Sequence, residues 1–147
     1  MRQAIKQFLK KSMPYEASTV NRILVSTFVA INRLQTLNDF IESYIISEKN
    51  HPDEICLFAK FYNLISSNCN TVGLEELIEF FEFVISPAEK EVNGAVYTPL
   101  YIREYIVEEV LKRYSDAELL NIKIGDLSCG CGGFFITAAV YIYQRTR

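Results

Sequence analysis

The sequence lacks several features that would place it in a specialised class of protein. Acidic residues outnumber basic ones by 18 to 15, so the chain has no excess of the positive charge by which proteins grip nucleic acid. It has four cysteines and one histidine, without the paired spacing of a zinc site, and no metal is expected. Because no signal peptide is recognised at the N-terminus, we expect reduced thiols in a cytoplasmic protein.

A membrane span is also missing from the sequence. The uncharged stretch at residues 127–144 contains glycines that leave only residues 134–143 strongly apolar, about half of the roughly 20 residues that a bilayer requires. What is present is a chain of 147 residues, half of them hydrophobic and 22% charged. This composition excludes disordered and fibrous classes and predicts a globular protein with a sizeable core.

Apolar residues recur at helical spacing through the first part of the chain. Residues 16–50 contain no proline or glycine and predict a long helix. Two further helices are predicted over residues 52–65 and 74–84, the last of them before a stop at Ser86. We therefore expect a mainly α protein in which residues 1–88 form a helical domain.

Residues 89–147 show a different organisation. Thr98-Pro99 predicts a helix start, with a capping hydroxyl before a proline at the first helical position. Residues 122–127 are the one predicted strand, followed by a glycine-rich loop over residues 128–133 and an apolar helix over residues 134–145. In such an arrangement the N–H groups at the helix start can meet part of a nucleotide-like ligand, although a tight turn alone is the alternative.

Two motifs in this half resemble a known family. Residues 126–135 read Asp-Leu-Ser-Cys-Gly-Cys-Gly-Gly-Phe-Phe and resemble the Asp-Pro-Ala-Cys-Gly-Ser-Gly-Gly-Phe-Leu signature of adenine-specific DNA methyltransferases of restriction-modification systems. Upstream, residues 94–99 read Gly-Ala-Val-Tyr-Thr-Pro and are similar to the Gly-x-x-Tyr-Thr-Pro element of type I modification subunits and fused type II enzymes. The resemblance implies that residues 89–147 are the truncated start of a Rossmann-like methyltransferase domain that uses S-adenosylmethionine.

The resemblance also implies which residues contact this cofactor. The Tyr-Thr-Pro element and the glycine loop would close on the methionyl end of S-adenosylmethionine, and Asp126 would receive its ammonium group directly or through water. The implied cofactor-binding residues are Tyr97, Thr98, Pro99, Asp126, Ser128, Gly130, Cys131, Gly132 and Gly133. The alternatives are that Asp126 only caps the loop and that the Tyr-Thr-Pro element only starts a helix.

The family's catalytic element is not found in this chain, so no catalytic residue is assigned. The family accepts the hydrogens of the adenine amino group with an Asn/Asp-Pro-Pro-Tyr/Phe tetrapeptide, whereas no two of the four prolines here are adjacent. We therefore expect an N-terminal part of a site-specific DNA adenine methyltransferase that is inactive by itself and binds its cofactor weakly or not at all.

Partners are implied by the same resemblance. They are the remainder of the methyltransferase, specificity and restriction subunits, and duplex DNA held by parts absent here. The apolar helix at residues 134–143 is hydrophobic nearly all round, so we expect the chain to self-associate through it or to fold it against the N-terminal helices. A lone strand at residues 123–127 should pair with another copy or be irregular. The alternative functions are a non-catalytic helical interaction module and a methyltransferase that acts on RNA or protein.

Overall fold

The structure is a computed structural model that describes residues 2–12, 16–35, 38–84 and 97–147. The described residues form helices and no strand, which confirms the prediction of a mainly α protein. They divide into two compact units, Met1–Ser86 and Pro87–Arg147. The predicted domain boundary between residues 88 and 89 and the first three residues of the Gly-x-x-Tyr-Thr-Pro element lie outside the described residues. None of the described helices is long and apolar enough to cross a membrane.

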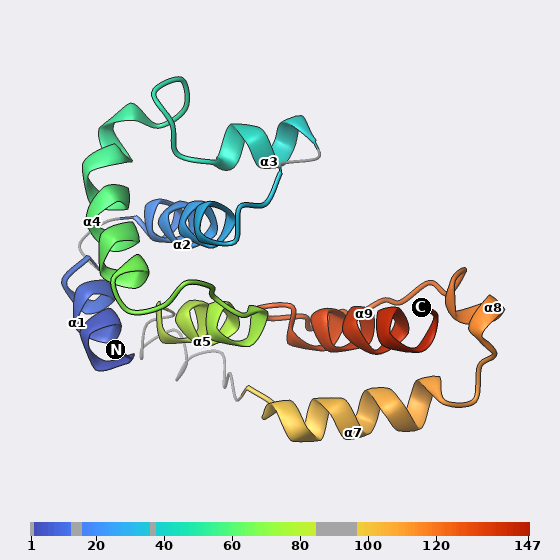
Figure 1. Cartoon of the computed structure of the whole chain (residues 1–147). Coiled ribbons are helices and arrows are strands. Elements are labelled where there is room, and N and C mark those ends of the chain that lie inside the picture. The colour runs from blue at the N-terminus through green and yellow to red at the C-terminus, as the bar shows by residue number, and fades with distance from the viewer. Residues whose placement is uncertain (1, 13–15, 36–37, 85–96) are drawn as a thin grey trace. The chain divides into compact units, whose positions relative to one another are not determined.

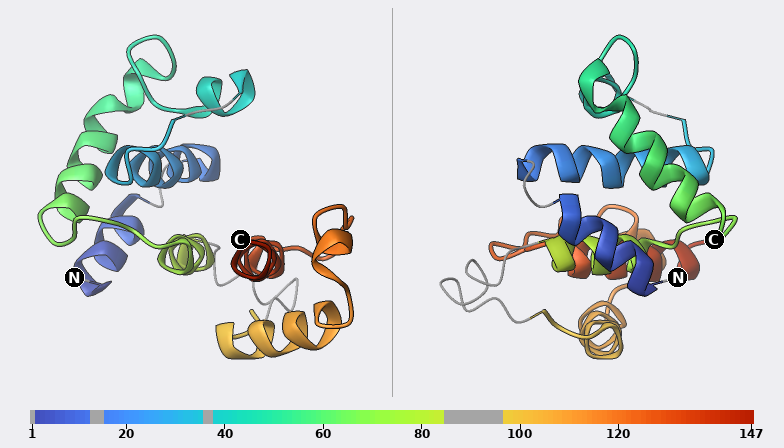
Figure 2. Two further views of the ribbon diagram at one scale, coloured as in Figure 1. Left: turned by 45° about the vertical axis from the view of Figure 1, so that its right-hand side comes forward. Right: turned by 90° about the vertical axis from the view of Figure 1, so that its left-hand side faces the viewer.

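The first unit packs helices around one apolar core (Figures 1 and 2). Its elements are α1 (Arg2–Ser12), α2 (Ala17–Ile31), α3 (Asp39–Tyr44), the short 3₁₀ helix η1 (Pro52–Glu54), α4 (Ile55–Ser66) and α5 (Leu74–Val84). The core combines buried side chains from α1, α2, α4 and α5, among them Ile5, Leu9, Ile23, Leu24, Phe61, Ile65 and Phe80. Helix α1 was not predicted, although Ile5, Phe8 and Leu9 have the three- and four-residue spacing of a helical face.

The predicted continuous helix over residues 16–50 is wrong. Helix α2 ends at Asn32, whose side-chain amide donates to the carbonyl of Phe28 within the helix at 3.0 Å and to the carbonyl of Val72 at 2.9 Å. Arg33 follows with a φ of 52°, in the left-handed region, which a helix cannot continue through. Asn38 then caps α3 by accepting from the backbone. Asparagine side chains thus end one helix and start the next without proline or glycine.

The other two helices predicted for this unit are confirmed. Residues 52–65 were predicted as one helix, and the structure has η1 followed directly by α4. The prediction for residues 74–84 coincides with α5, whose first turn is held by Glu76, which accepts from the N–H of Gly73 at 2.8 Å. The predicted stop at Ser86 lies outside the described residues.

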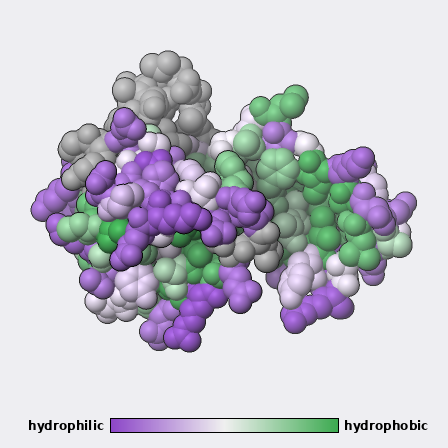
Figure 3. All heavy atoms as spheres, turned by 90° about the horizontal axis from the view of Figure 1, so that it is seen from above, coloured by the Kyte–Doolittle hydropathy of each residue, from purple (hydrophilic) through white to green (hydrophobic). Residues whose placement is uncertain are grey.

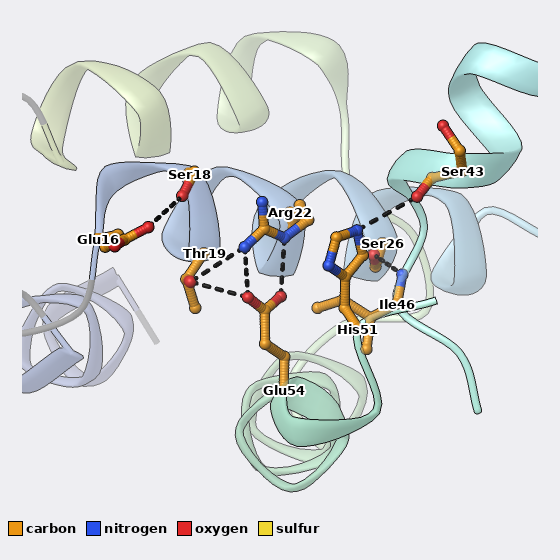
Figure 4. A network of polar contacts seen from close by, with 9 residues as sticks. All are labelled: Glu16, Ser18, Thr19, Arg22, Ser26, Ser43, Ile46, His51 and Glu54. Carbon is orange, nitrogen blue, oxygen red and sulfur yellow. Dashed lines mark hydrogen bonds and ion pairs between the residues drawn. The ribbon is translucent and has the colours of Figure 1, made fainter. Parts of the chain in front are cut away.

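A nearly buried ion pair joins α2 to the start of α4 (Figure 4). Arg22 donates through Nε to Oε2 of Glu54 at 2.9 Å and through Nη2 to Oε1, while Thr19 donates its hydroxyl to Oε1 at 2.8 Å. Each charged side chain is only 15% exposed. The hydrogen bonds from Arg22 outweigh the effect of burial and lower the pKa of Glu54. Nearby, the Ser26 hydroxyl of α2 accepts from the N–H of Ile46 at 3.0 Å and so holds the segment that follows α3 against α2.

This ion pair predicts a pH dependence of folding stability. Because the pKa of Glu54 is lower in the folded than in the unfolded chain, its contribution is complete above the ordinary value of about 4.3 and is lost as the pH falls further. We expect Glu54→Gln to reduce the loss of unfolding free energy between about pH 5 and pH 3. Urea unfolding at each pH measures this free energy, and Glu16→Gln, at an exposed carboxylate, is the control. If the unfolding free energies of wild type and Glu54→Gln fell equally with pH, the stabilising role assigned to the Glu54 carboxylate would be contradicted.

The second unit contains α7 (Leu100–Leu111), α8 (Asp116–Leu119) and α9 (Gly133–Arg145). Helices α7 and α9 lie side by side and run in the same direction (Figures 1 and 2). A small core lies between the three helices and is made by Val107, Leu111, Leu119 and Ala138. Helix α8 was not predicted, although its Ser-x-x-Glu capping box, Ser115 with Glu118, is visible in the sequence.

The predicted strand over residues 122–127 is not formed. Residues 122–126 have no regular secondary structure, and residues 127–128 form a turn. Only irregular backbone is expected where no second strand is available to pair with the first. This outcome agrees with the expectation that a lone strand here would be irregular unless another copy paired with it.

Arg145 fastens the C-terminal ends of α7 and α9 together. Its guanidinium donates to the carbonyl oxygens of Leu111 at 3.2 Å and Tyr114 at 2.6 Å. It also forms an ion pair with Asp116, with 3.0 Å between Nε and Oδ1. One side chain thus binds carbonyl groups at and just beyond the end of α7, where a helix makes fewer hydrogen bonds of its own.

Candidate functional site

The two sequence motifs meet in the second unit. The thiol of Cys131 donates to the phenol oxygen of Tyr97 across 3.9 Å. A Cβ built on Gly130 would lie 3.6 Å from Cε1 of the same ring. Tyr97 therefore lies against the glycine loop although more than thirty positions separate them in the sequence. The structure thus brings Tyr97 of the first motif to the loop at residues 128–133.

Two glycines of the loop are required by the backbone conformation. Gly130 has a φ of 52° and Gly132 a φ of 78°, the left-handed region that other residues rarely adopt. The N–H of Gly132 donates to the carbonyl of Cys129 at 2.7 Å and closes the turn before α9. A Cβ on Gly132 would meet nothing within 4 Å, so this position borders open space at the start of the helix.

Asp126 bonds to its own loop. Its Oδ1 accepts from the N–H of Ser128 at 2.9 Å and from the Ser128 hydroxyl at 3.3 Å. Asp126 therefore caps the loop, which is one of the two roles that the sequence allowed; the other is a contact with the cofactor. The carboxylate is half-buried and Ser128 is exposed at the mouth of the loop.

The predicted start of α7 is displaced by one residue. Pro99, not Thr98, is the N-cap, and its carbonyl accepts from the N–H groups of Ile102 at 3.0 Å and Arg103 at 3.1 Å. Pro99 has a ψ of 148°, which is extended, so the helix begins at Leu100. No side chain caps this helix. The carbonyl of Thr98 is instead taken by Nε of Arg103 at 3.1 Å.

Sequence reasoning missed Arg103, which is 5% exposed between the starts of α7 and α9. The apolar side chains of Ile106 and Val110 are exposed, and the buried face of α7 carries Arg103, Val107 and Leu111. The four-residue spacing of these three positions is the signal that was available. Burying a charged side chain is costly unless it is hydrogen-bonded, so a face that carries an arginine is not expected to be buried until the partners of that arginine are known.

An apolar groove with a volume of about 510 Å³ opens beside the site. It is lined by α7, by residues 122–126 and by the first turns of α9. Lys123 and Asp126 are the charged residues of its lining. Three aliphatic side chains along it remain 40–46% exposed, namely Ile106, Val110 and Ile124. Figure 3 shows hydrophobic residues at the surface of the second unit, at the right of the picture.

The site shows no sign of a metal centre in the part of the chain that the structure describes. No group of three His, Cys, Asp or Glu side chains there is close enough to hold a metal ion. Cys56, Cys69, Cys129 and Cys131 carry thiols and take part in no disulfide. The chemistry available at the loop is therefore that of backbone N–H groups, a carboxylate, a phenol and thiols.

Comparison with known proteins finds a distant similarity to a restriction enzyme and methyltransferase. It is 30% identical over 144 residues to the type II restriction enzyme and methyltransferase RM.Eco57I of Escherichia coli. The alignment covers 92% of this chain but only 14% of that protein's length. No family model matches the chain, and no solved structure matches it.

Proposed function

We propose that this chain carries part of the S-adenosylmethionine site of a DNA adenine methyltransferase in a restriction-modification system. The observation that carries the proposal is the contact of Tyr97 with the glycine loop at Gly130 and Cys131. Two separate motifs that resemble one family's cofactor elements lie together in space. The similarity to a restriction enzyme and methyltransferase supports the same class of function.

The chemistry of the loop suits the methionyl end of the cofactor. That end carries a carboxylate and an ammonium group. The N–H groups at the start of α9 are donors for a carboxylate, and their helix dipole favours negative charge. Asp126 supplies an acceptor for the ammonium group. Because Gly132 borders open space, a ligand can approach the backbone closely there.

The chain alone should not transfer a methyl group. Its four prolines are isolated, so the tetrapeptide that would accept the adenine amino hydrogens is missing. The proposal assigns that step, and the grip on duplex DNA, to other parts of the complete methyltransferase. Specificity and restriction subunits are its further proposed partners.

Cofactor binding and methyl transfer test this function together. S-adenosylmethionine is titrated by calorimetry into this chain and into the complete gene product, and methyl transfer to duplex DNA, RNA and protein is assayed with radiolabelled cofactor. We expect tight binding and DNA adenine methylation only for the complete product. Methylation of RNA or protein alone would replace the proposed acceptor, and no cofactor binding by either protein would contradict the proposal.

A second role, as an interaction module, is favoured by the apolar surface of the second unit. Phe135, Val140 and Tyr143 of α9 are exposed, as are the aliphatic side chains along the groove. Burying one large apolar side chain contributes roughly 1.5–3 kcal/mol. We propose that the isolated chain covers this surface with a second copy of itself.

If the chain self-associates, its apparent molecular mass in solution rises with its concentration. Sedimentation velocity over a wide concentration range should show a dimer that weakens at least tenfold in Phe135→Asp, because a carboxylate would then have to be desolvated in the interface. Phe40→Asp, at an exposed phenylalanine of the first unit, is the matched control and should leave the dimer intact. A monomer at every concentration would contradict the proposal.

A further inference from the structure

We infer that Arg103 is a positioning residue that sets the spacing between the Tyr97–Pro99 turn and the glycine loop. Its Nε donates to the carbonyl of Thr98 at 3.1 Å, at the start of α7. Its Nη1 donates to the hydroxyl of Thr137 at 3.4 Å, on α9. One nearly buried guanidinium thus connects both segments. Its role for the cofactor rests on the proposed function, whereas its role in spacing the segments does not.

Gly133 gives independent support because its missing side chain makes room for Arg103. A Cβ built on Gly133 would lie 2.5 Å from Nη1, 3.1 Å from Cζ and 3.3 Å from Cδ of Arg103. These distances are shorter than van der Waals contact, so a side chain there would displace the guanidinium. Unlike Gly130 and Gly132, Gly133 has no positive φ. The glycine at this position is thus explained by the arginine and not by the backbone conformation.

The connection continues to the first turn of α9. The Thr137 hydroxyl, which accepts from Arg103, donates to the carbonyl of Gly133 at 2.8 Å. The guanidinium is therefore held against the residue at which the glycine loop ends and the helix begins. Because Arg103 as a whole residue is only 5% exposed, it acts through Thr98 and Gly133 and not by touching a ligand.

Arg145 is a matched control within the same unit. It also joins α7 to the remainder of the unit through carbonyl oxygens, but at the other end of the helix pair, at Leu111 and Tyr114. Its loss should destabilise the unit without changing the glycine loop. A comparison of the two arginines separates positioning of the loop from general stabilisation.

The first measurement is a double-mutant cycle on thermal stability. Gly133→Ala should lower the unfolding midpoint of the second unit by about 4–8 °C in the wild-type and Arg145→Ala backgrounds. In the Arg103→Ala background the space beside Gly133 is no longer occupied by the arginine side chain. Because alanine is also a better helix former than glycine, Gly133→Ala should there leave the unfolding midpoint unchanged or raise it. Arg103→Lys, which replaces the guanidinium by a smaller ammonium group and keeps the aliphatic part of the side chain, serves as a second background should Arg103→Ala not fold. An equal loss in every background would overturn the inference.

The second measurement follows the backbone amides by NMR at a temperature where every variant is folded. Arg103→Ala should shift the amide signals of residues 97–98 and 130–133, and Arg145→Ala those of residues 111–116. In the complete gene product Arg103→Ala should bind S-adenosylmethionine at least tenfold more weakly, and Arg145→Ala as wild type does. Unchanged loop signals, or equal affinities of the two variants, would overturn the inference. If wild type binds no cofactor while the cycle and the amide shifts hold, the proposed function fails and the positioning role stands.

Discussion

The substitution Gly132→Val will abolish binding of S-adenosylmethionine to the complete gene product. Gly132 has a φ of 78°, a conformation that a β-branched residue does not adopt without strain. Its missing Cβ faces open space at the start of α9, where the cofactor would approach the backbone. Valine would therefore both distort the turn and fill the approach. Isothermal titration calorimetry should show no binding heat at concentrations that saturate the wild type.

A second variant separates these two causes. Asparagine tolerates the left-handed region much better than valine, so Gly132→Asn keeps the turn while still placing a side chain in the open space. Loss of binding in both variants would assign the effect to the blocked approach, and loss in Gly132→Val alone to the backbone. Wild-type affinity in Gly132→Val would contradict the assignment of the loop to the cofactor.

Arg22→Met is expected to destabilise the first unit by about 3 kcal/mol, at the lower end of the cost of breaking a buried ion pair. The substitution leaves the carboxylate of Glu54 only 15% exposed and without its cation. Thr19 remains as a donor to Oε1 but supplies no charge. Urea unfolding followed by the amide signals of α2 and α4 measures the change.

Two controls test whether the charge left alone causes this loss. The double variant Arg22→Met with Glu54→Leu should recover most of the stability, because apolar residues often replace a buried ion pair at little cost. Lys112→Met breaks the exposed pair with Glu109 and should leave stability unchanged. A loss in the double variant as large as in Arg22→Met would indicate that packing of the arginine stem, and not its charge, stabilises the unit.

Helix positions were predictable where apolar spacing and a clear end coincide. Helices α4, α5 and α9 follow such patterns, and the structure places them within a few residues of the prediction. The break after α2 was not predictable from that spacing, because the apolar pattern continues while the Asn32 amide bonds to Val72, a residue distant in sequence. A hydrogen bond across that separation exists only once the fold has formed.

The buried face of α7 could not be read from the helix's own sequence for a related reason. Apolarity favoured Ile106 and Val110, yet the structure buries the row that contains Arg103 and leaves these two exposed to the groove. Hydrogen bonds to Thr98 and Thr137 offset the cost of burying the arginine. Those partners come from outside the helix, so its own sequence cannot show which face turns inward.

The candidate site was identified from motifs, and its assembly was learned from the structure. The resemblance named Tyr97 and the glycine loop together, but it gave no reason for Gly133 beyond close approach of a ligand. The contact between Gly133 and Arg103 supplies that reason, and it depends on the packing of α7 against α9. Asp126 likewise was assigned to the cofactor, and the structure adds its bonds to Ser128.

Amide mapping of the cofactor on this chain shows directly whether the glycine loop contacts the methionyl end of S-adenosylmethionine. S-adenosylmethionine is titrated to millimolar concentration into the ¹⁵N-labelled chain, with S-adenosylhomocysteine and free methionine in parallel to show that the methionyl end is recognised. We expect weak, saturable shifts of the amides of residues 97–98 and 130–133, absent in Gly132→Val, and no shifts in the first unit. Shifts confined to the first unit, or loop shifts that persist unchanged in Gly132→Val, would contradict the assignment of the loop to the cofactor.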